Sequence, residues 1–260
     1  MEGFASVEGG RLWYERHGEG FPVVLIHPGL WDSRIWDAQF EEFGRHHDVV
    51  RYDVRGSGRS DPAEHPYSDL RDLRYLLGEL EIGRCALVGC ATGAQLALDF
   101  ELAYPSLVDA VVAVSPGISG YRWNDAGLEL LVQEVEAAVR VGDLERAMAV
   151  ELAVWAPVSA GAADAAARQI AMDNAHVLRV DDTLLETAPS AVTRLGDVDA
   201  ATLVIVGDHD LQEIHDIADL LVASIPGASK RVIANADQLV NVARPDRFNR
   251  MVLDFLSFRM

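Results

Sequence analysis

The sequence has few cysteines and no long apolar run. Its 260 residues include two cysteines, Cys85 and Cys90, which lie on one expected strand about 16 Å apart and too far for a disulfide. The apolar stretches at 23–26 and 110–114 fall far short of the roughly 18 residues that span a bilayer. The first residues show neither the basic nor the apolar segment of a signal peptide. We therefore expect a reduced, soluble, cytoplasmic protein with no membrane partner.

Positive charge is scarce as well. The chain has 22 Lys and Arg against 41 Asp and Glu, a net charge of −19, which repels nucleic acid and anionic lipid. With 50% hydrophobic and 24% charged residues, the composition is globular and excludes wholesale disorder. We expect a small-molecule partner and no nucleic acid, and the sequence leaves a homodimer open.

Short apolar runs alternate with helical patterns on both sides of a central helical stretch. Strands are expected at 11–17, 22–27, 48–54, 85–90, 110–115, 202–206 and 230–234. Helices are expected at 35–45, 68–80, 92–103, 128–141, 144–155, 162–177, 214–225 and 245–258. Continuous apolar strands indicate a parallel sheet covered on both faces, so we predict an α/β fold with a doubly wound, mostly parallel sheet of about eight strands. Residues 1–120 and 196–260 would form the core domain, and 121–195 a helical insertion.

An expected strand turns directly into a helix at Ala91. Glycines stand two residues before and two residues after it, in Gly89-Cys90-Ala91-Thr92-Gly93. This spacing is what a strained turn needs to push its central side chain out at the carboxyl edge of the sheet. The amides of Thr92 and Gly93 would begin the helix, where they can donate to an anion.

Five segments of the chain resemble the α/β-hydrolase family, in the family's order. They are 24–30, 52–60, 87–94, 204–210 and 233–248. The resemblance implies an α/β-hydrolase fold with a helical lid and no cofactor. It also implies an oxyanion hole from the amides of Gly29, Leu30 and Thr92. Asp210 would be the triad acid, and Gln238 stands at the histidine position.

Two of the three triad positions lack the residue that the chemistry needs. Ala91 replaces the serine of the family's Gly-x-Ser-x-Gly, and no histidine follows His215, so Gln238 has no substitute nearby. Alanine has no nucleophilic atom, and glutamine accepts no proton near neutral pH. Losing either the nucleophile or the base costs a serine hydrolase about 10⁶ in kcat, and losing both costs little more. We predict no ester hydrolysis by acyl transfer.

Nearby reactive groups have ordinary structural explanations. Cys90 adjoins Ala91, but neighbouring side chains on a strand point to opposite faces, so we expect a buried structural cysteine. The acidic and histidine residues of 208–215 match no metal motif, and we expect solvated loop charges and no metal. His27 is expected to tie its loop. Asp53 and Arg55 are expected to hold their turn together through a local salt bridge.

Several large side chains are expected to face Ala91 from loops and from the insertion. Packing within the lid and contact with a ligand both explain each of them, and together they predict an apolar pocket between insertion and sheet. The set is Trp31, Tyr121, Trp123, Trp155, Met172 and His176.

Three functions stay open at this point. The chain could be an ester, lactone or carbon–carbon bond hydrolase whose serine and histidine were replaced to trap a substrate. It could be a natural variant that runs proton transfer through Asp210, a lyase step or the cyclisation of a reactive intermediate, none of which needs a nucleophile. It could also bind or sense a small ligand without catalysis. The fold does not decide among them, and we favour an enzyme family acting on a small apolar molecule.

Overall fold

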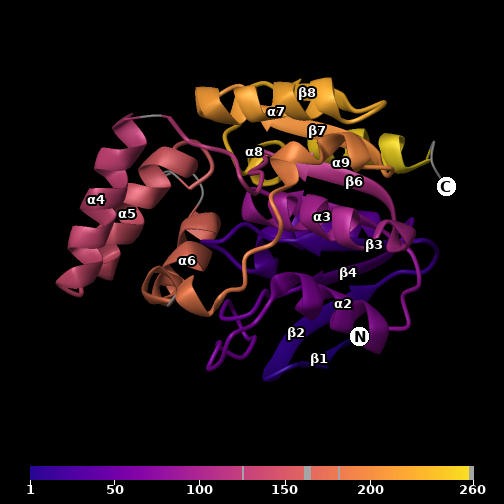
Figure 1. Ribbon diagram of the computed structural model, residues 1–260, viewed down its shortest axis with the longest axis horizontal. Coiled ribbons are helices and arrows are strands. Elements are labelled where there is room, and N and C mark those ends of the chain that lie inside the picture. The colour runs from indigo at the N-terminus through magenta and orange to yellow at the C-terminus, as the bar shows by residue number, and fades with distance from the viewer. Residues whose placement is uncertain (125, 161–164, 181, 258–260) are drawn as a thin grey trace.

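The computed structural model describes residues 1–124, 126–160, 165–180 and 182–257. Eight strands form one sheet in the order β1-β2-β4-β3-β5-β6-β7-β8 (Figure 1). The pairs β1–β2 and β2–β4 are antiparallel, and the other neighbouring pairs are parallel. The strands are β1 (Glu2–Val7), β2 (Gly10–His17), β3 (Pro22–Ile26), β4 (Asp48–Tyr52), β5 (Cys85–Cys90), β6 (Val108–Val114), β7 (Ala201–Gly207) and β8 (Ser229–Ile233). The predicted mostly parallel α/β sheet is confirmed.

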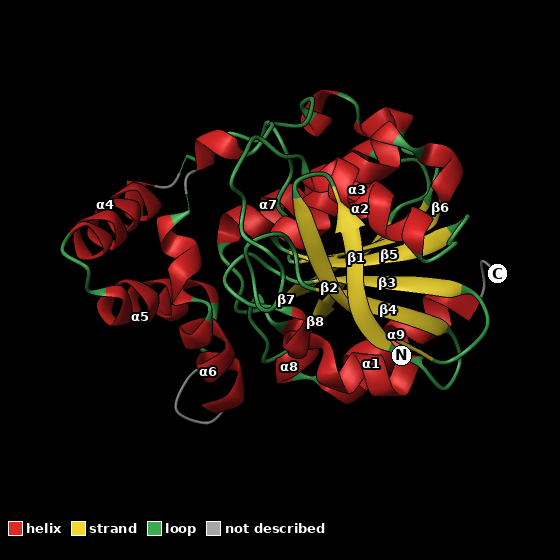
Figure 2. Ribbon diagram, turned by 90° about the horizontal axis from the view of Figure 1, so that it is seen from below, coloured by secondary structure: helices red, strands yellow, loops and turns green. Residues whose placement is uncertain are grey.

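Helices cover both faces of this sheet (Figure 2). One face carries α1 (Asp37–Phe43), α8 (Val240–Ala243) and α9 (Pro245–Ser257), and the other carries α2 (Asp69–Glu79), α3 (Thr92–Ala103) and α7 (Gln212–Ser224). None of the helices described is long and apolar enough to cross a bilayer.

The side chains of strand β3 are buried by the helices on both faces of the sheet. Successive side chains of a strand point to opposite faces. Val24 and Ile26 accordingly pack in the core beneath α2, α3 and α7, whereas Val23 and Leu25 pack in the core beneath α1 and α9. All four side chains are fully buried, which accounts for the continuous apolar run in the sequence.

The expected elements have the observed bounds to within a few residues where the chain is described, with two omissions. The expected start of the helix at 162–177 and the expected end of the helix at 245–258 lie outside the described residues. The side chain of Ser68 accepts a hydrogen bond from the Arg71 amide and caps α2, as its position predicts. Strand β1 was not predicted because it is an edge strand in which only Ala5 is buried, so it lacks an apolar pattern. Helix α8 was not predicted because it has only four residues.

Residues between β6 and β7 form the helical insertion, seen at the left of Figure 1. It contains α4 (Ala126–Arg140), α5 (Leu144–Trp155) and α6 (Ala165–Asp173), followed by short 3-10 turns. Within its described residues, no strand joins the main sheet. Helix α4 packs mainly on α5, whereas α5 and α6 also contact the segments around them.

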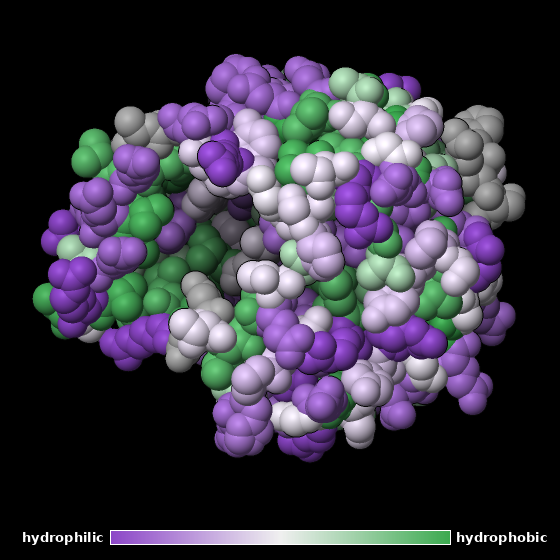
Figure 3. Space-filling view, in the orientation of Figure 1, coloured by the Kyte–Doolittle hydropathy of each residue, from purple (hydrophilic) through white to green (hydrophobic). Residues whose placement is uncertain are grey.

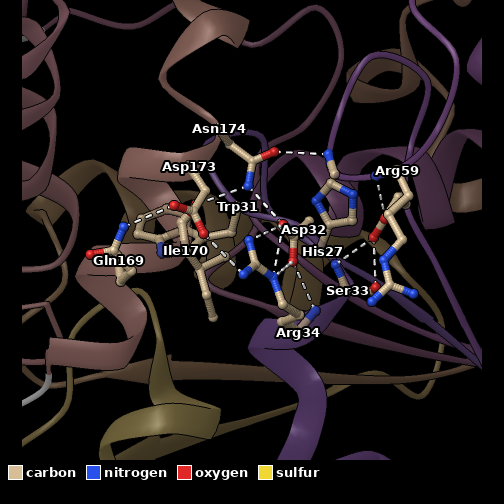
Figure 4. Close-up of polar contacts among 12 residues, drawn as sticks. His27, Trp31, Asp32, Ser33, Arg34, Arg59, Gln169, Ile170, Asp173 and Asn174 are labelled. Carbon is tan, nitrogen blue, oxygen red and sulfur yellow. Dashed lines mark hydrogen bonds and ion pairs between the residues drawn. The ribbon is translucent and has the colours of Figure 1, made fainter.

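A polar network fastens α6 to the core (Figure 4). The Arg34 guanidinium pairs with Asp32 at 2.8 Å and with Asp173, at the end of α6, at 3.0 Å. The Asn174 amide donates to Asp32 and accepts from the Gly58 backbone, both at 2.8 Å. The end of α6 is therefore held by both loops that follow β3 and β4.

A second fastening involves Asp237, in the loop after β8. Its carboxylate accepts hydrogen bonds from the amides of Val158 and Ser159 at 2.7 and 2.8 Å, and from the Ser159 hydroxyl. The same carboxylate accepts from the Leu239 amide at 3.2 Å. The chain just after α5 is thus bonded to the loop that carries Gln238.

Candidate functional site

The turn between β5 and α3 is strained at its centre. Ala91 has φ 52° and ψ −111°, a conformation that costs an L-residue about 1–3 kcal/mol. A Cβ at Gly89 would lie 2.1 Å from the Gly93 carbonyl oxygen, and a Cβ at Gly93 would lie 2.3 Å from that of Ile26. Only glycine fits at these two positions, which explains the spacing seen in the sequence.

A cavity of about 830 Å³ lies between this turn and the helical insertion. Figure 3 shows the hollow between the α4–α5 region and the core, with apolar side chains on its wall. Many residues singled out from the sequence line this larger cavity. They are Gly29, Leu30, Trp31, Ala91, Thr92, Trp123, Trp155 and Gln238.

Four other residues singled out from the sequence lie elsewhere. Tyr121 lines a second cavity of about 580 Å³ beside the first, and its ring meets that of Trp123 edge to face at 5.8 Å. Met172 packs against the core beneath α1 and α9. His176 is exposed, and its Nε2 lies 2.9 Å from the Gly56 carbonyl oxygen. Asp210 is not among the residues that line the larger cavity.

Three residues that line the larger cavity have backbone amides from which no described residue accepts a hydrogen bond. In the described chain, nothing accepts a hydrogen bond from the amides of Gly29 and Leu30. The Thr92 amide is the first of α3 and has no acceptor within the helix. A Cβ at Gly29 would lie 3.4 Å from the Thr92 hydroxyl oxygen, so the two segments touch. These amides can donate to an oxygen atom in the cavity.

His27 holds the loop that carries two of these amides. Its Nε2 accepts from the Val54 amide at 2.9 Å, so the proton resides on Nδ1, which lies 2.9 Å from the Pro28 carbonyl oxygen. Burial lowers the pKa of this imidazole, which keeps the ring neutral. The structure therefore gives His27 the loop-tying position that we expected.

Asp210 follows β7 and is bonded on one carboxylate oxygen. Oδ2 accepts from the Ser115 hydroxyl and the Gly207 amide, both at 2.7 Å. Burial raises the pKa of Asp210 to about 7, and the Asp237 carboxylate adds to the rise. Ser115 also lines the larger cavity, so its hydroxyl connects Asp210 with the cavity wall.

The side chain of Cys90 contacts the backbone of Gln238. The Cys90 sulfur lies 3.4 Å from the Gln238 carbonyl oxygen. The thiol belongs to the core beneath α1 and α9 and does not line the cavity. Burial raises its pKa well above the usual range, so it stays a thiol and not a nucleophilic thiolate.

The salt bridge expected at the turn after β4 has a different partner. Arg55 pairs with Asp72 of α2 at 2.7 Å, and the two side chains are 2% and 4% exposed. Asp53 instead accepts hydrogen bonds from the Ser33 and Arg59 amides. The expectation of a local bridge was wrong because the long Arg55 side chain reaches beneath the β1–β2 turn, where Asp72 is buried.

The charged side chains within 208–215 lie in different surroundings. Asp208 and His209 are exposed, and Glu213 accepts a hydrogen bond from the Asn124 amide at 2.6 Å. Across the residues that the structure describes, no three His, Cys, Asp or Glu side chains gather as metal ligands would.

The sequence reasoning missed Glu151 of α5, which lines the larger cavity. Its Oε2 accepts from the Trp155 indole N–H at 2.8 Å, and burial raises its pKa. The spacing of four residues between Glu151 and Trp155, one helical turn, was a usable signal. Ser115 and Gln95 were missed as well, because neither belongs to a motif.

Comparison with known proteins identifies the family. A family model described as the alpha/beta hydrolase family matches residues 23–251, so the chain belongs to that family. "Putative carbamate hydrolase RutD" of Serratia proteamaculans is 26% identical, with 90% of this chain and 91% of that protein covered. A 2-hydroxy-6-oxononadienedioate/2-hydroxy-6-oxononatrienedioate hydrolase of Paraburkholderia xenovorans is 28% identical, over 95% and 91% of the two chains. The crystal structure of a hydrolase from Pseudomonas aeruginosa has 26% identity and a TM-score of 0.83, with 98% of each chain covered.

Proposed function

We propose that this chain, as a member of the α/β-hydrolase family, binds a small, largely apolar carbonyl compound in the larger cavity and converts it by proton transfer without an acyl-enzyme. The observation that carries the proposal is the set of unbonded amides at Gly29, Leu30 and Thr92 beside a turn centred on Ala91. Such amides stabilise negative charge on an oxygen. An enolate carries that charge and forms without a nucleophile.

Asp210 is the proposed proton-transfer group. A general acid or base works best when its pKa is close to the working pH, and burial brings that of Asp210 to about 7. The proton would leave a carbon beside the carbonyl group, and Ser115, bonded to Asp210 at 2.7 Å, would relay it. Isomerisation, elimination and ring closure all begin in this way.

The remaining cavity residues would bind the ligand. Residues 121–195 act in this proposal as the lid over the core formed by 1–120 and 196–260. Trp31, Trp123 and Trp155 supply apolar contacts from the cavity wall. The names of the carbamate hydrolase and of the oxo-acid hydrolase both indicate carbonyl-containing substrates for those relatives, which supports a carbonyl compound here.

Ligand binding without catalysis is the second candidate. The observation that favours it is that Asp210 does not itself line the larger cavity. Ser115, its link to the cavity, is fully buried. A protein of this kind would keep the pocket and the amides but transfer no proton.

Deuterium exchange separates the two candidates. The test ligand is 1-indanone, an apolar ketone, which is incubated with the protein in D₂O. It should raise the melting temperature of the protein. Its C2 proton signals should also disappear from the ¹H NMR spectrum faster than they do in buffer alone. D210N should keep the thermal shift and lose the exchange, whereas D254N, at an exposed position, should keep both. Equal exchange with D210N would favour the binding protein. Absence of a thermal shift with a panel of apolar ketones and lactones would contradict the proposal.

A further inference from the structure

Two carboxylates line the larger cavity, and they differ in setting. Glu129 of α4 is exposed, whereas Glu151 of α5 is partly buried. The Trp155 indole donates to Oε2 of Glu151 at 2.8 Å. Because both residues lie on one helix, this bond fixes the carboxylate in one orientation at the apolar wall.

Glu151 has no charge partner in the part of the chain that the structure describes. No ion pair involves it, and Oε1 accepts no hydrogen bond from a described residue. Glu151 is partly buried, and partial burial of a carboxylate that has no charge partner is unfavourable because it removes part of the hydration. An apolar residue would fill this position of α5 at lower cost if packing were its only role.

We propose that Glu151 is the residue through which the larger cavity selects ligands that carry an amine or hydroxyl group. The inference rests on the proposed function, because the cavity must first hold a small apolar molecule. An N–H or O–H of that molecule would donate to the unpartnered Oε1, while the apolar body contacts the surrounding aromatic rings. A hydrogen bond of this charge-assisted kind corresponds to about 10- to 100-fold in affinity.

Displacement of a fluorescent probe measures this selection. N-phenyl-1-naphthylamine would report on the cavity, and three ligands of similar size would compete with it: 2-phenylethylamine, 2-phenylethanol and ethylbenzene. We expect the first two to bind the natural protein about 10- to 100-fold more tightly than ethylbenzene. The donor preference should disappear in E151L. In E151Q, which keeps an acceptor oxygen but no charge, the alcohol should keep more of its preference than the amine.

Two controls make the outcome decisive. E145Q changes an exposed carboxylate of the same helix that does not line the cavity and should leave the preference intact. E151Q matches glutamate in size and can still accept from Trp155, so it provides the test if E151L does not fold. Equal binding of all three competitors, or a preference that survives both variants, would overturn the role of Glu151 while leaving ligand binding in place. Failure of the probe, of the three competitors and of the apolar ketones and lactones to bind would overturn the proposed function itself.

Discussion

Replacing Asp210 by asparagine tests the ionisation of the proposed proton-transfer group through stability alone. In the folded chain burial raises the pKa of Asp210 to about 7 from its ordinary value of 3.8. Between these two pH values the folded state holds a proton that the unfolded state has released. The free energy of unfolding therefore falls by about 1.4 kcal/mol per pH unit across this range, or about 4 kcal/mol in all.

Asparagine escapes this loss because it stays neutral at every pH. Its side-chain oxygen can still accept from the Ser115 hydroxyl and the Gly207 amide, which both bond to one oxygen of Asp210. We expect D210N to be about 2–4 kcal/mol more stable than the natural protein at pH 8. At the unfolding entropy typical of 260 residues, this is a rise in Tm of about 4–7 °C. At pH 5, only about one pH unit above the ordinary value of 3.8, D210N should be more stable by about 1.5 kcal/mol and no more.

The assay is thermal unfolding followed by circular dichroism at pH 5 and pH 8. Burial also raises the pKa of Asp69 to about 7. Because Asp69 is present in both proteins, the difference in Tm between D210N and the unmodified protein reports on Asp210. D254N, at an exposed position, is the control and should leave Tm unchanged at both pH values. A D210N protein that is less stable at pH 8, or that shifts equally at both pH values, would refute the reasoning.

Three further experiments use substitutions at the turn, at the Arg55–Asp72 pair and at Gly93. The unmodified protein should show neither a burst nor an acyl-enzyme mass with 4-nitrophenyl acetate. Ala91→Ser combined with Gln238→His should give esterase turnover far above either single change, because nucleophile and base act as a unit. An inert double variant would mean that the amides are misplaced for acyl transfer. Arg55→Met should cost about 3–5 kcal/mol in urea unfolding because it leaves Asp72 buried and unpaired, and adding Asp72→Leu should recover most of that loss. Gly93→Ala should cost about 1–3 kcal/mol or more, since its Cβ would lie 2.3 Å from a carbonyl oxygen of β3; an unchanged urea midpoint would contradict the close packing.

The fold was predictable where burial leaves a local pattern. Strands covered on both faces, such as β3 and β5, are continuous apolar runs. The glycine spacing around Ala91 is likewise visible in the sequence, although the contact that requires Gly93 is with Ile26 of β3. Strand β1 left no such pattern, because it lies at the edge with Ala5 as its one buried residue. Its place depends on pairing with β2 and not on its own composition.

The candidate site was less predictable because side chains distant in sequence build its walls. A glutamate on a helix usually faces water, so the spacing of Glu151 and Trp155 by one helical turn indicates that the two side chains are neighbours but not that they line an apolar cavity. The partner of Arg55 was missed for a related reason, since only the packing of α2 brings Asp72 beneath the turn. Periodicity identifies a buried face, but it does not identify the element that covers it.

The two fastenings of the insertion leave its helices unequally held. Asp237 bonds the chain at 158–159, and the network of Asp32, Arg34 and Asn174 bonds the end of α6, whereas α4 contacts mainly α5. Helix α5 also packs into the core through Met148 and Leu152. We therefore expect α4 to be the most easily displaced helix of the insertion. Amide hydrogen exchange should accordingly be fast in α4 and slow at the end of α6.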